Sequence, residues 1–400
     1  MSMYTIGMSG LLATSDALDT VSNNIANAST AGFKSSATAF TAVYSGGQAG
    51  GVEASTVTQS FSTDGSLVET GSDLDLAISG SGFFVISNGN TTAYTRAGEF
   101  SVDSDNNVVT SSGWNLQGYT VNAEGELEIG QVTDLKVTST TMAAKASTSL
   151  DLASNMNSSA TTITDTFDAS DSSTYNYSTT STLYDSQGAE HTLSQYYVKT
   201  GDNTWSVYYT VDGEALTDSS GTAVSTTLTF DTDGALTSPT SAVTLSIDLD
   251  STDDISLSID YSDFTQYSSD FSTTTNEADG YTAGTLSDVY FDDDGYLYAT
   301  YSNGETVLQG QVVLATFVNV DGLEQGDGTV WYATSESGNA ILSTPGSGTA
   351  GTLTVGSYED SNVDITTELV DLMSLQRNYQ ANSKVLTTAS DLSSVLFNAF

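Results

Sequence analysis

The feature that most constrains the fold is the spacing of apolar residues in the last part of the chain, residues 364–400. These residues lie three, four or seven positions apart and therefore share one side of an α-helix: Ile365, Leu369, Leu372, Leu375, Tyr379, Leu386, Ala389, Leu392 and Leu396. Asp364 can cap the first turn, and neither Gly nor Pro interrupts the pattern. About 32 residues at about 1.5 Å each predict a helix of roughly 48 Å, which needs a partner along its length.

The first residues of the chain predict that partner helix. Apolar side chains repeat here in steps of four and three, and Ser15 and Ser22 occupy the two remaining positions of the stripe formed by Tyr4, Met8, Leu11, Leu18 and Ile25. Two such helices bury too little apolar surface to offset the cost of ordering their backbones, so further burial has to come from other copies. We therefore predict a terminal coiled coil through which the protein assembles with itself.

The charge of the chain restricts its partners. Asp and Glu number 50 against 7 Lys and Arg, a net charge of −43, which argues against binding to nucleic acid or to an anionic membrane. Residues 1–52 carry a net charge of −1 and residues 364–400 carry −2, so the charge lies almost wholly between them. Dense like charge does not fit between identical copies, which indicates packed termini and an acidic exterior in water. A general shortage of acidic residues in amphipathic helices would explain the same partition.

The same charge predicts how a polymer of this chain depends on salt. Copies that carry −43 each repel one another when they stack. Screening of this repulsion improves as the Debye length falls from about 8 Å at 0.15 M salt to about 3 Å at 1 M. We expect a polymer that requires salt or cations.

The sequence offers little catalytic or metal-binding chemistry. It has no Cys, and its one histidine, His191, excludes a histidine cluster. Residues 231–234 and 292–295 resemble pieces of calcium loops, but Thr240 and Tyr301 stand where such a loop needs Glu. We interpret both as hairpin turns and predict no catalytic residue, no metal site and no cofactor; weak, non-specific cation binding stays open.

The start of the chain does not resemble an export leader. Residues 1–19 have neither a basic segment nor a continuous apolar run, and no run of eighteen apolar residues occurs in the sequence. We expect no cleaved signal peptide and no membrane insertion, and a leaderless route if the protein works outside the cell.

The middle of the chain predicts β-structure. Leu74, Leu76 and Ile78 alternate with polar residues, and residues 181–213 suggest an antiparallel meander of three strands. Because the terminal helices must lie together, everything between them is an insertion. We predict a mainly β fold with a terminal α-helical coiled coil and nested, discontinuous β-domains (antiparallel barrels or sandwiches) between the helices. The expected parts are a helical domain, an extended linker, an inner β-domain and an outer β-domain, with the boundaries 1–28 plus 364–400, 29–70 plus 350–363, 71–147 plus 277–349, and 148–276.

Several segments resemble one known protein family. SNNIANASTAGFKSS (residues 22–36) and ELVDLMSLQRNYQANSKVLTT (residues 368–388) are similar to the terminal signatures of the axial proteins of the bacterial flagellum, which comprise rod, hook and hook-associated proteins. DLAISGSGFFVI (residues 75–86) and YTRAGEFSVD (residues 94–103) resemble the first β-domain of rod and hook proteins. The meander at residues 181–213 resembles the outer domain of hook proteins specifically.

Arg96 lies in the second of these β-domain segments and is one of two arginines in the chain. A guanidinium in this place can bridge a carboxylate or extend into water. We favour the ordinary surface position.

The resemblance implies a non-enzymatic structural subunit of the flagellar hook, which polymerises into a curved, flexible tube that transmits motor torque to the filament. Its implied partners are other copies, the rod, the hook cap, the hook–filament junction and the flagellar type III export apparatus, and its implied location is the flagellum outside the cell. Another axial protein, such as the distal rod, and an acidic secreted adhesin or cation-binding module remain alternatives. The residues expected to serve assembly are Tyr4, Met8, Leu11, Leu18, Asn23, Asn24, Ile25, Asn27, Gly32, Phe33, Ile365, Leu369, Leu372, Tyr379, Leu386, Leu392 and Leu396.

Overall fold

The computed structural model describes residues 3–398 except 46–47, 123–124, 219 and 250–253. The chain divides into two compact units. Unit 1 comprises Met1–Ser139, Asp288–Thr300 and Thr306–Phe400, and unit 2 comprises Thr140–Ser287 and Tyr301–Glu305. The chain therefore begins and ends in unit 1, and the sequence of unit 2 is inserted within it. The mainly β fold with a helix at each end of the chain is confirmed.

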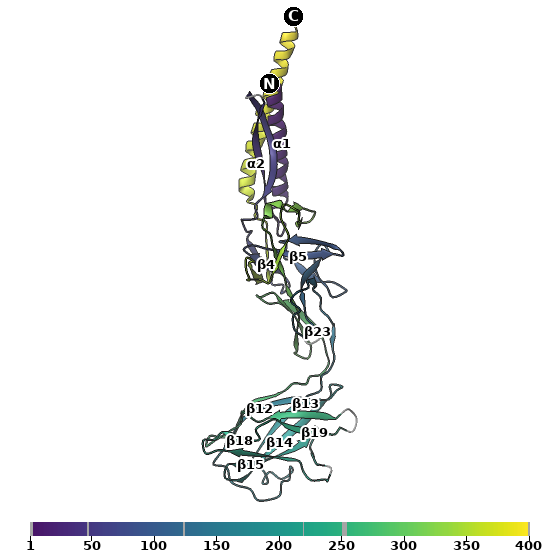
Figure 1. Ribbon diagram of the computed structural model, residues 1–400, viewed down its shortest axis with the longest axis vertical. Coiled ribbons are helices and arrows are strands. Elements are labelled where there is room, and N and C mark those ends of the chain that lie inside the picture. The colour runs from purple at the N-terminus through teal and green to yellow at the C-terminus, as the bar shows by residue number, and fades with distance from the viewer. Residues whose placement is uncertain (1–2, 46–47, 123–124, 219, 250–253, 399–400) are drawn as a thin grey trace. The chain divides into compact units, whose positions relative to one another are not determined.

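Two long helices run antiparallel in unit 1, α1 (Met3–Ala26) and α2 (Ile365–Asn398) (Figure 1). Their direction follows from their contacts, because Gly7 near the start of α1 lies beside Leu386, whereas Asn24 near its end donates a hydrogen bond to Glu368. The predicted cap is confirmed, since Asp364 Oδ1 accepts a hydrogen bond of 2.8 Å from the N–H of Thr366. The last turns of α2 continue past the first turn of α1 (Figure 1).

A β-hairpin lies against α1 where the sequence predicted an extended linker. Its strands, β1 (Ser36–Ser45) and β2 (Gln48–Gln59), pair antiparallel from Ser36–Gln59 to Ser45–Gln48. Hydroxyl oxygens of Thr20 and Thr38 lie 2.9 Å apart across the contact with α1. The sequence did not reveal the hairpin because its glycine pairs indicated a loose segment; residues 46–47 lie outside the described residues.

The rest of unit 1 is β-structure. Its largest sheet has the strand order β24 (Tyr296–Tyr301), β25 (Thr306–Val312), β9 (Asn115–Thr120), β5 (Phe83–Asn88), β6 (Thr91–Thr95), β28 (Val330–Tyr332) and β27 (Glu324–Gln325). Shorter strands on this sheet are β7 (Phe100–Val102), β8 (Val108–Thr110), β10 (Thr133–Asp134), β26 (Leu314–Thr316) and β29 (Ile341–Ser343), and a 3-10 turn spans Val320–Gly322. Two separate pairs connect distant segments, β3 (Leu67–Glu69) with β31 (Ser357–Glu359) and β4 (Leu76–Ser79) with β30 (Thr352–Val355).

Unit 2 contains two sheets. One has the order β19 (Val243–Ile247), β20 (Ile255–Asp260), β12 (Ser149–Asn157), β21 (Thr265–Tyr267), with β22 (Ser272–Ala278) also on β12. The other has the order β13 (Tyr177–Tyr184), β14 (Glu190–Gly201), β15 (Thr204–Val211), β17 (Ser225–Phe230), β18 (Leu236–Ser238), with β16 (Glu214–Ala215) on β15. The predicted meander is confirmed as β13–β14–β15. Strand β12 departs from the antiparallel pattern, because it pairs parallel with β20 and β21. The short β11 (Thr141–Met142) pairs with the start of β23 (Gly284–Phe291).

The core of unit 2 is one continuous cluster that draws on both sheets. It contains Trp205, Tyr197 and Tyr261, all inaccessible to solvent or nearly so, among Leu, Ile and Val side chains. The polar atoms of these rings have partners inside the core: Trp205 Nε1 donates to Gln266 Oε1 at 2.7 Å, and the Tyr261 hydroxyl donates to Gln195 Oε1 at 2.8 Å. Burial raises the pKa of Tyr261 well above its ordinary value, so this hydroxyl stays protonated.

Candidate assembly surface

The contact between the two helices is made by small residues of α1. A buried stripe repeats in steps of three and four, formed by Gly7, Gly10, Thr14, Ala17, Val21 and Asn24. A Cβ atom on Gly10 would lie 2.9 Å from Asn382 Nδ2, so glycine permits the close approach of α2. This stripe precedes the predicted one by one position, a rotation of about 100° around α1. The sequence signal that reveals it is the heptad spacing of small residues rather than of large ones.

The predicted α1 stripe therefore does not form the contact with α2. Tyr4 and Met8 are exposed, and Leu11, Leu18 and Ile25 are half-buried. The predicted residues of α2 divide in the same way: Leu372 and Leu386 are half-buried, whereas four are exposed, namely Ile365, Leu369, Tyr379 and Leu392. The side chain of Leu396 lies outside the described residues. The physical reason is that a large side chain holds the two helix axes apart, while glycine and alanine let them approach.

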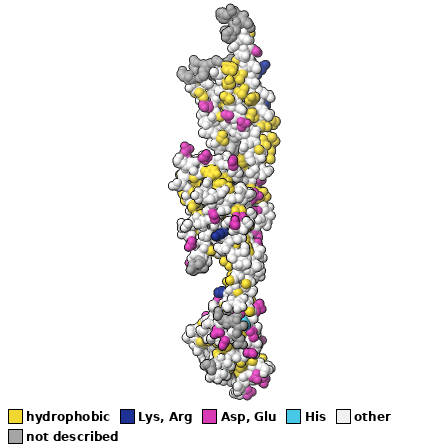
Figure 2. All heavy atoms as spheres, turned by 90° about the vertical axis from the view of Figure 1, so that its right-hand side faces the viewer, with side chains coloured by type: hydrophobic (Ala, Val, Ile, Leu, Met, Phe, Trp, Pro, Cys, Tyr) yellow, Lys and Arg dark blue, Asp and Glu magenta, His cyan; other side chains and the backbone are white. Residues whose placement is uncertain are grey.

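Helix α2 leaves most of its surface uncovered. Between Ile365 and Val395, the part whose side chains are described, no residue of α2 is buried. We call the exposed large apolar side chains of this region the apolar helical surface; they are Tyr4, Ile6, Met8 and Leu12 of α1, Phe40, Tyr44 and Val57 of the hairpin, and Ile365, Leu369, Val370, Met373, Tyr379, Val385, Leu392 and Val395 of α2. Figure 2 shows hydrophobic side chains gathered at the helical end of unit 1. Exposure of this extent marks a surface that binds another macromolecule.

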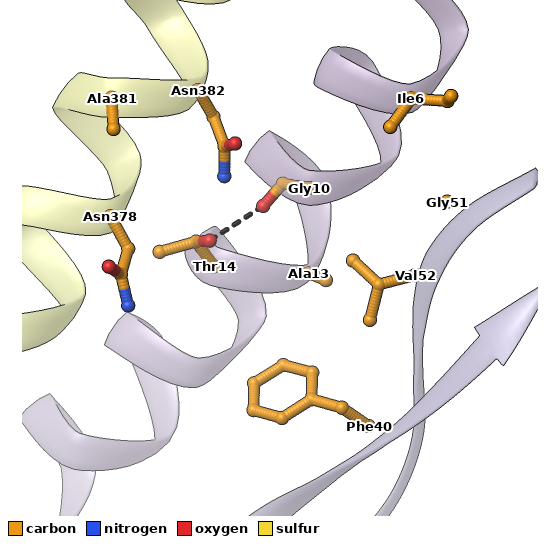
Figure 3. A pocket seen from close by; sticks show the side chains of 10 residues that line it. All are labelled: Ile6, Gly10, Ala13, Thr14, Phe40, Gly51, Val52, Asn378, Ala381 and Asn382. Atoms are coloured by element: carbon orange, nitrogen blue, oxygen red, sulfur yellow. Dashed lines mark hydrogen bonds between the residues drawn. The ribbon is translucent and has the colours of Figure 1, made fainter. Parts of the chain in front are cut away.

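A cavity of about 400 Å³ opens where α1, α2 and the hairpin meet (Figure 3). Phe40 and Val52 line its hairpin side, and Asn378 and Asn382 reach toward α1 from α2. The hydroxyl of Thr14 is occupied within its own helix, because it donates to the carbonyl oxygen of Gly10 at 2.6 Å. The cavity is therefore a hollow in the apolar helical surface with carboxamide groups at one side.

The chain reversal after α1 uses several residues that the sequence assigned to assembly. Asn24 is 1% exposed and connects three segments, since it donates to the carbonyl of Ser36 and to Glu368 and accepts from the N–H of Ser36. Phe33 is also buried, and Gly32 has a φ of +67° at a place where a Cβ would overlap the backbone of Ala97. These three residues hold the fold together, and their part in assembly stays a prediction.

The two other residues assigned to assembly in this segment lie nearer the surface. Asn23 is exposed and Asn27 is half-buried. Asn27 Nδ2 donates to the carbonyl oxygen of Asn23 at 3.0 Å, and the N–H of Asn27 bonds to the same carbonyl at 3.1 Å. Both residues therefore close the last turn of α1, and the Asn23 side chain also faces solvent.

A buried ion network ties together three distant parts of unit 1. Glu359 accepts from Lys34 Nζ at 2.7 Å and from Arg96 Nη1 at 3.0 Å, and all three side chains are almost inaccessible to solvent. The expectation that Arg96 is a surface residue is wrong, because its guanidinium is enclosed with Glu359 and the carbonyl oxygen of Ile78. Burial lowers the pKa of Lys34 below its ordinary value, although the Glu359 carboxylate acts in the opposite direction.

The acidic turns are structural. Asp231 Oδ1 accepts N–H bonds from Asp233 and Ala235, which closes the turn between the paired strands β17 and β18 and confirms the interpretation of residues 231–234 as a hairpin turn. Asp292 Oδ1 accepts the N–H of Tyr296 at 2.8 Å in the corresponding turn between β23 and β24. In the described part of the chain, no three His, Asp or Glu side chains lie close enough together to hold a metal ion.

The single histidine has acidic neighbours. His191 Nδ1 lies 2.7 Å from Asp212 Oδ2, and its Nε2 lies 3.8 Å from Asp185 Oδ2. Partial burial opposes the charge of Asp212, but bonds from the N–H of Thr192 and from the imidazole outweigh it and lower the pKa of this carboxyl. The three side chains sit at the ends of β-strands of unit 2.

None of the described helices is long and apolar enough to cross a membrane.

Models of four flagellar families match successive parts of the chain. They are described as flagella basal body rod protein (residues 5–34), flagellar hook protein FlgE/F/G D1 domain (residues 77–148), flagellar basal body protein FlaE D2 domain (residues 153–281) and flagellar basal body rod FlgEFG protein C-terminal (residues 354–399). Together with paired terminal helices around inserted β-structure, these matches define the class as an axial protein of the bacterial flagellum.

Full-length relatives narrow this class. The chain is 39% identical over 99% of both chains to the flagellar hook protein FlgE of Escherichia coli (strain K12), and 35% identical to that of Rhizobium meliloti (strain 1021), with 100% of this chain and 99% of the relative covered. The chain belongs to the flagellar hook protein family, and its function is that of a structural subunit of the hook. A solved structure of Helicobacter pylori flagellar hook protein FlgE2 has a similar fold, with a TM-score of 0.53 at 15% identity over 72% of this chain and 98% of that one.

Proposed function

We propose that the apolar helical surface joins copies of this chain into the hook polymer. The observation that carries the proposal is that α2, a helix of 34 residues, buries none of its described side chains within its own chain. A helix with this many exposed apolar residues is stable when a neighbour covers them. Contacts between different faces of identical copies leave open ends, so such copies add one after another into a helical tube rather than a closed ring.

The tube is also the mechanical element of the proposal. It is flexible and curved, and it transmits torque from the motor to the filament while it bends. Its further partners are the rod at one end, the cap and the hook–filament junction at the other, and the flagellar export apparatus through which the subunit leaves the cell. The role is structural rather than enzymatic, and electron microscopy of the polymer tests it, because a straight, rigid rod contradicts the bending.

The four nested parts expected from the sequence belong to this proposal. The helical part (residues 1–28 and 364–400) makes the main contacts between copies, and the linker part (29–70 and 350–363) supports it. The inner and outer β-domains (71–147 with 277–349, and 148–276) form the outside of the tube. Support comes from the charge, since the residues between 52 and 364 carry nearly all of the −43 and suit a surface in water.

A double substitution, Leu392→Asp with Val395→Asp, tests the assembly surface. These side chains are 56% and 65% exposed and follow Leu386, which lies beside Gly7 near the start of α1, so their replacement removes little packing within the chain. We expect the monomer to keep its circular dichroism spectrum and its sedimentation coefficient, and the pelleted polymer to disappear. The matched control is Val318→Asp, which changes an 84% exposed apolar residue between β26 and the 3-10 turn, outside both helices. Tubes of the double variant at the wild-type protein concentration would contradict the proposal.

A further inference from the structure

The chain contains the tripeptide Ser-Asn-Gly twice, at residues 87–89 and 302–304, and Asn precedes Gly nowhere else in the sequence. The first copy lies at the turn between β5 and β6, and the second at the turn between β24 and β25. The dipeptide Asn-Gly is chemically labile, because glycine has no side chain to keep its backbone nitrogen away from the asparagine carboxamide. Since the preceding residue is also the same, local sequence makes the two sites similar in reactivity, and the fold decides between them.

The second site is held in place by its turn. Asn303 Nδ2 donates to the carbonyl oxygen of Thr282 at 2.8 Å, and its Oδ1 accepts the N–H of Glu305 at 3.1 Å. The N–H of Gly304, the group that would have to attack the carboxamide, donates to the carbonyl oxygen of Tyr301 at 2.9 Å. Both reacting groups are therefore occupied, and these hydrogen bonds must open before the site can react.

The first site has none of these restraints. Asn88 is exposed at the end of β5 and pairs with Thr91 of β6 across a turn of two residues. None of the described residues offers a hydrogen-bond partner to the carboxamide of Asn88 or to the N–H of Gly89. Gly89 has a φ of +64°, and a Cβ there would meet nothing within 4 Å, so the turn is open to water. The two reacting groups can therefore approach each other without losing a contact.

We propose that Asn88 is a site of spontaneous deamidation and that the hydrogen bonds of its turn protect Asn303. The backbone nitrogen of Gly89 gives its proton to solvent and bonds to Cγ of Asn88, and the carboxamide nitrogen leaves as ammonia. Water then opens the resulting succinimide ring at one of its two carbonyl carbons, which leaves aspartate or isoaspartate at position 88. The reaction consumes one water, releases one ammonia and requires no enzyme. Each event adds one negative charge to a chain that carries −43.

Peptide mapping of the full-length protein tests the assignment. Soluble monomer, taken from the supernatant after sedimentation, is incubated for increasing times in a mildly alkaline buffer. Mass spectrometry then measures the conversion of carboxamide to carboxyl in the peptides that contain Asn88 and Asn303. Because hydrogen bonds must open first at Asn303, we expect Asn88 to convert about tenfold faster or more. Digestion in water labelled with a heavy oxygen isotope distinguishes conversion during incubation from conversion during digestion.

The unfolded chain is the matched control. Concentrated urea removes both turns, so the two Ser-Asn-Gly sites should then convert at rates within about twofold of each other. In the folded protein, Asn88→Gln should abolish the more acidic species that accumulate on anion exchange, because glutamine forms the corresponding larger ring much more slowly. If Asn88 converts no faster than Asn303 in the folded protein, or if the difference between the two sites persists in urea, the proposal is overturned.

Discussion

Unit 2 and the helical part of unit 1 solve the burial problem in different ways. Unit 2 encloses its large aromatic side chains between its own two sheets, and the polar atoms of Trp205 and Tyr261 have partners inside that core. Helix α2 encloses none of its described side chains, although apolar residues recur along it from Ile365 to Val395. The difference supports the proposal that neighbours complete the helical region, whereas unit 2 is complete as a single chain. The stability of unit 2 should therefore respond to substitutions in its own core. The packing of the helices should respond to conditions that govern contact between chains.

The largest expected effect separates the two regions by salt. Dialysis of the polymer into low-salt buffer with chelator should dissociate it, because subunits that carry −43 each are then poorly screened. The internal contacts of unit 2 are not between copies, so its thermal unfolding should change little. Sedimentation measures the dissociation of the polymer, and circular dichroism measures the thermal unfolding of unit 2. A polymer that remains intact without salt would contradict the charge argument.

A core substitution should act on unit 2 alone. Trp205→Ala removes a side chain with no solvent exposure and leaves Gln266 Oε1 without the donor Trp205 Nε1, so we expect the free energy of unfolding of unit 2 to fall by about 3–5 kcal/mol. Urea unfolding measured by circular dichroism tests this. Tyr267→Ala, at an exposed aromatic residue of the same unit, is the control. Equal losses of unfolding free energy in both variants would show that unit 2 does not enclose Trp205 in its core.

A substitution in the buried ion network of Lys34, Arg96 and Glu359 should have an effect of intermediate size. Glu359→Gln leaves Lys34 and Arg96 with only the more distant and partly exposed carboxylate of Asp64, 3.7 Å from each, and should destabilise unit 1 by about 3 kcal/mol. Exposed Glu324→Gln makes the same chemical change and should have a small effect. Hydrogen exchange at β3, β4, β30 and β31 reports the loss locally. Unchanged protection of these strands would mean that the network does not hold the segments together.

The smallest expected effect concerns pH in unit 2. Partial burial opposes the charge of Asp279, but hydrogen bonds from Ser149, Thr148 and Lys145 outweigh it and hold the pKa of this carboxyl below its ordinary value. A lowered folded-state pKa stabilises above the unfolded pKa of about 3.9, and this stabilisation is lost as pH falls through the folded value. Asp279→Asn should therefore cost about 1–2 kcal/mol at pH 7 and progressively less below about pH 4.

Unfolding by urea at several pH values measures this difference, with exposed Asp263→Asn as the control. A cost of Asp279→Asn that stays constant down to the lowest pH at which unit 2 is folded would show that the charge of the carboxylate is not its source.

Local signals in the sequence predicted the helices, the meander and the acidic turns, because each depends on residues close together in the chain. Asp364 marked the start of α2, and residues 181–213 contained their own turns. What could not be predicted depended on distant partners. Arg96 is enclosed by Glu359, which lies 263 positions away, and no local pattern reveals such a pair. The stripe on α1 was predicted one residue too far toward the C-terminus, because the prediction relied on large apolar residues. The structure shows instead that Gly10 determines how closely α2 approaches.

The antiparallel pairing of α1 with α2 has a consequence for synthesis of the protein. Residues 27–364 separate the two helices, so a chain still on the ribosome carries α1 long before α2 exists. The shared surface arises only once translation has passed the second helix. If the tube is built through that surface as proposed, unfinished products cannot join it, and the geometry of the fold itself acts as a check on the completeness of each subunit.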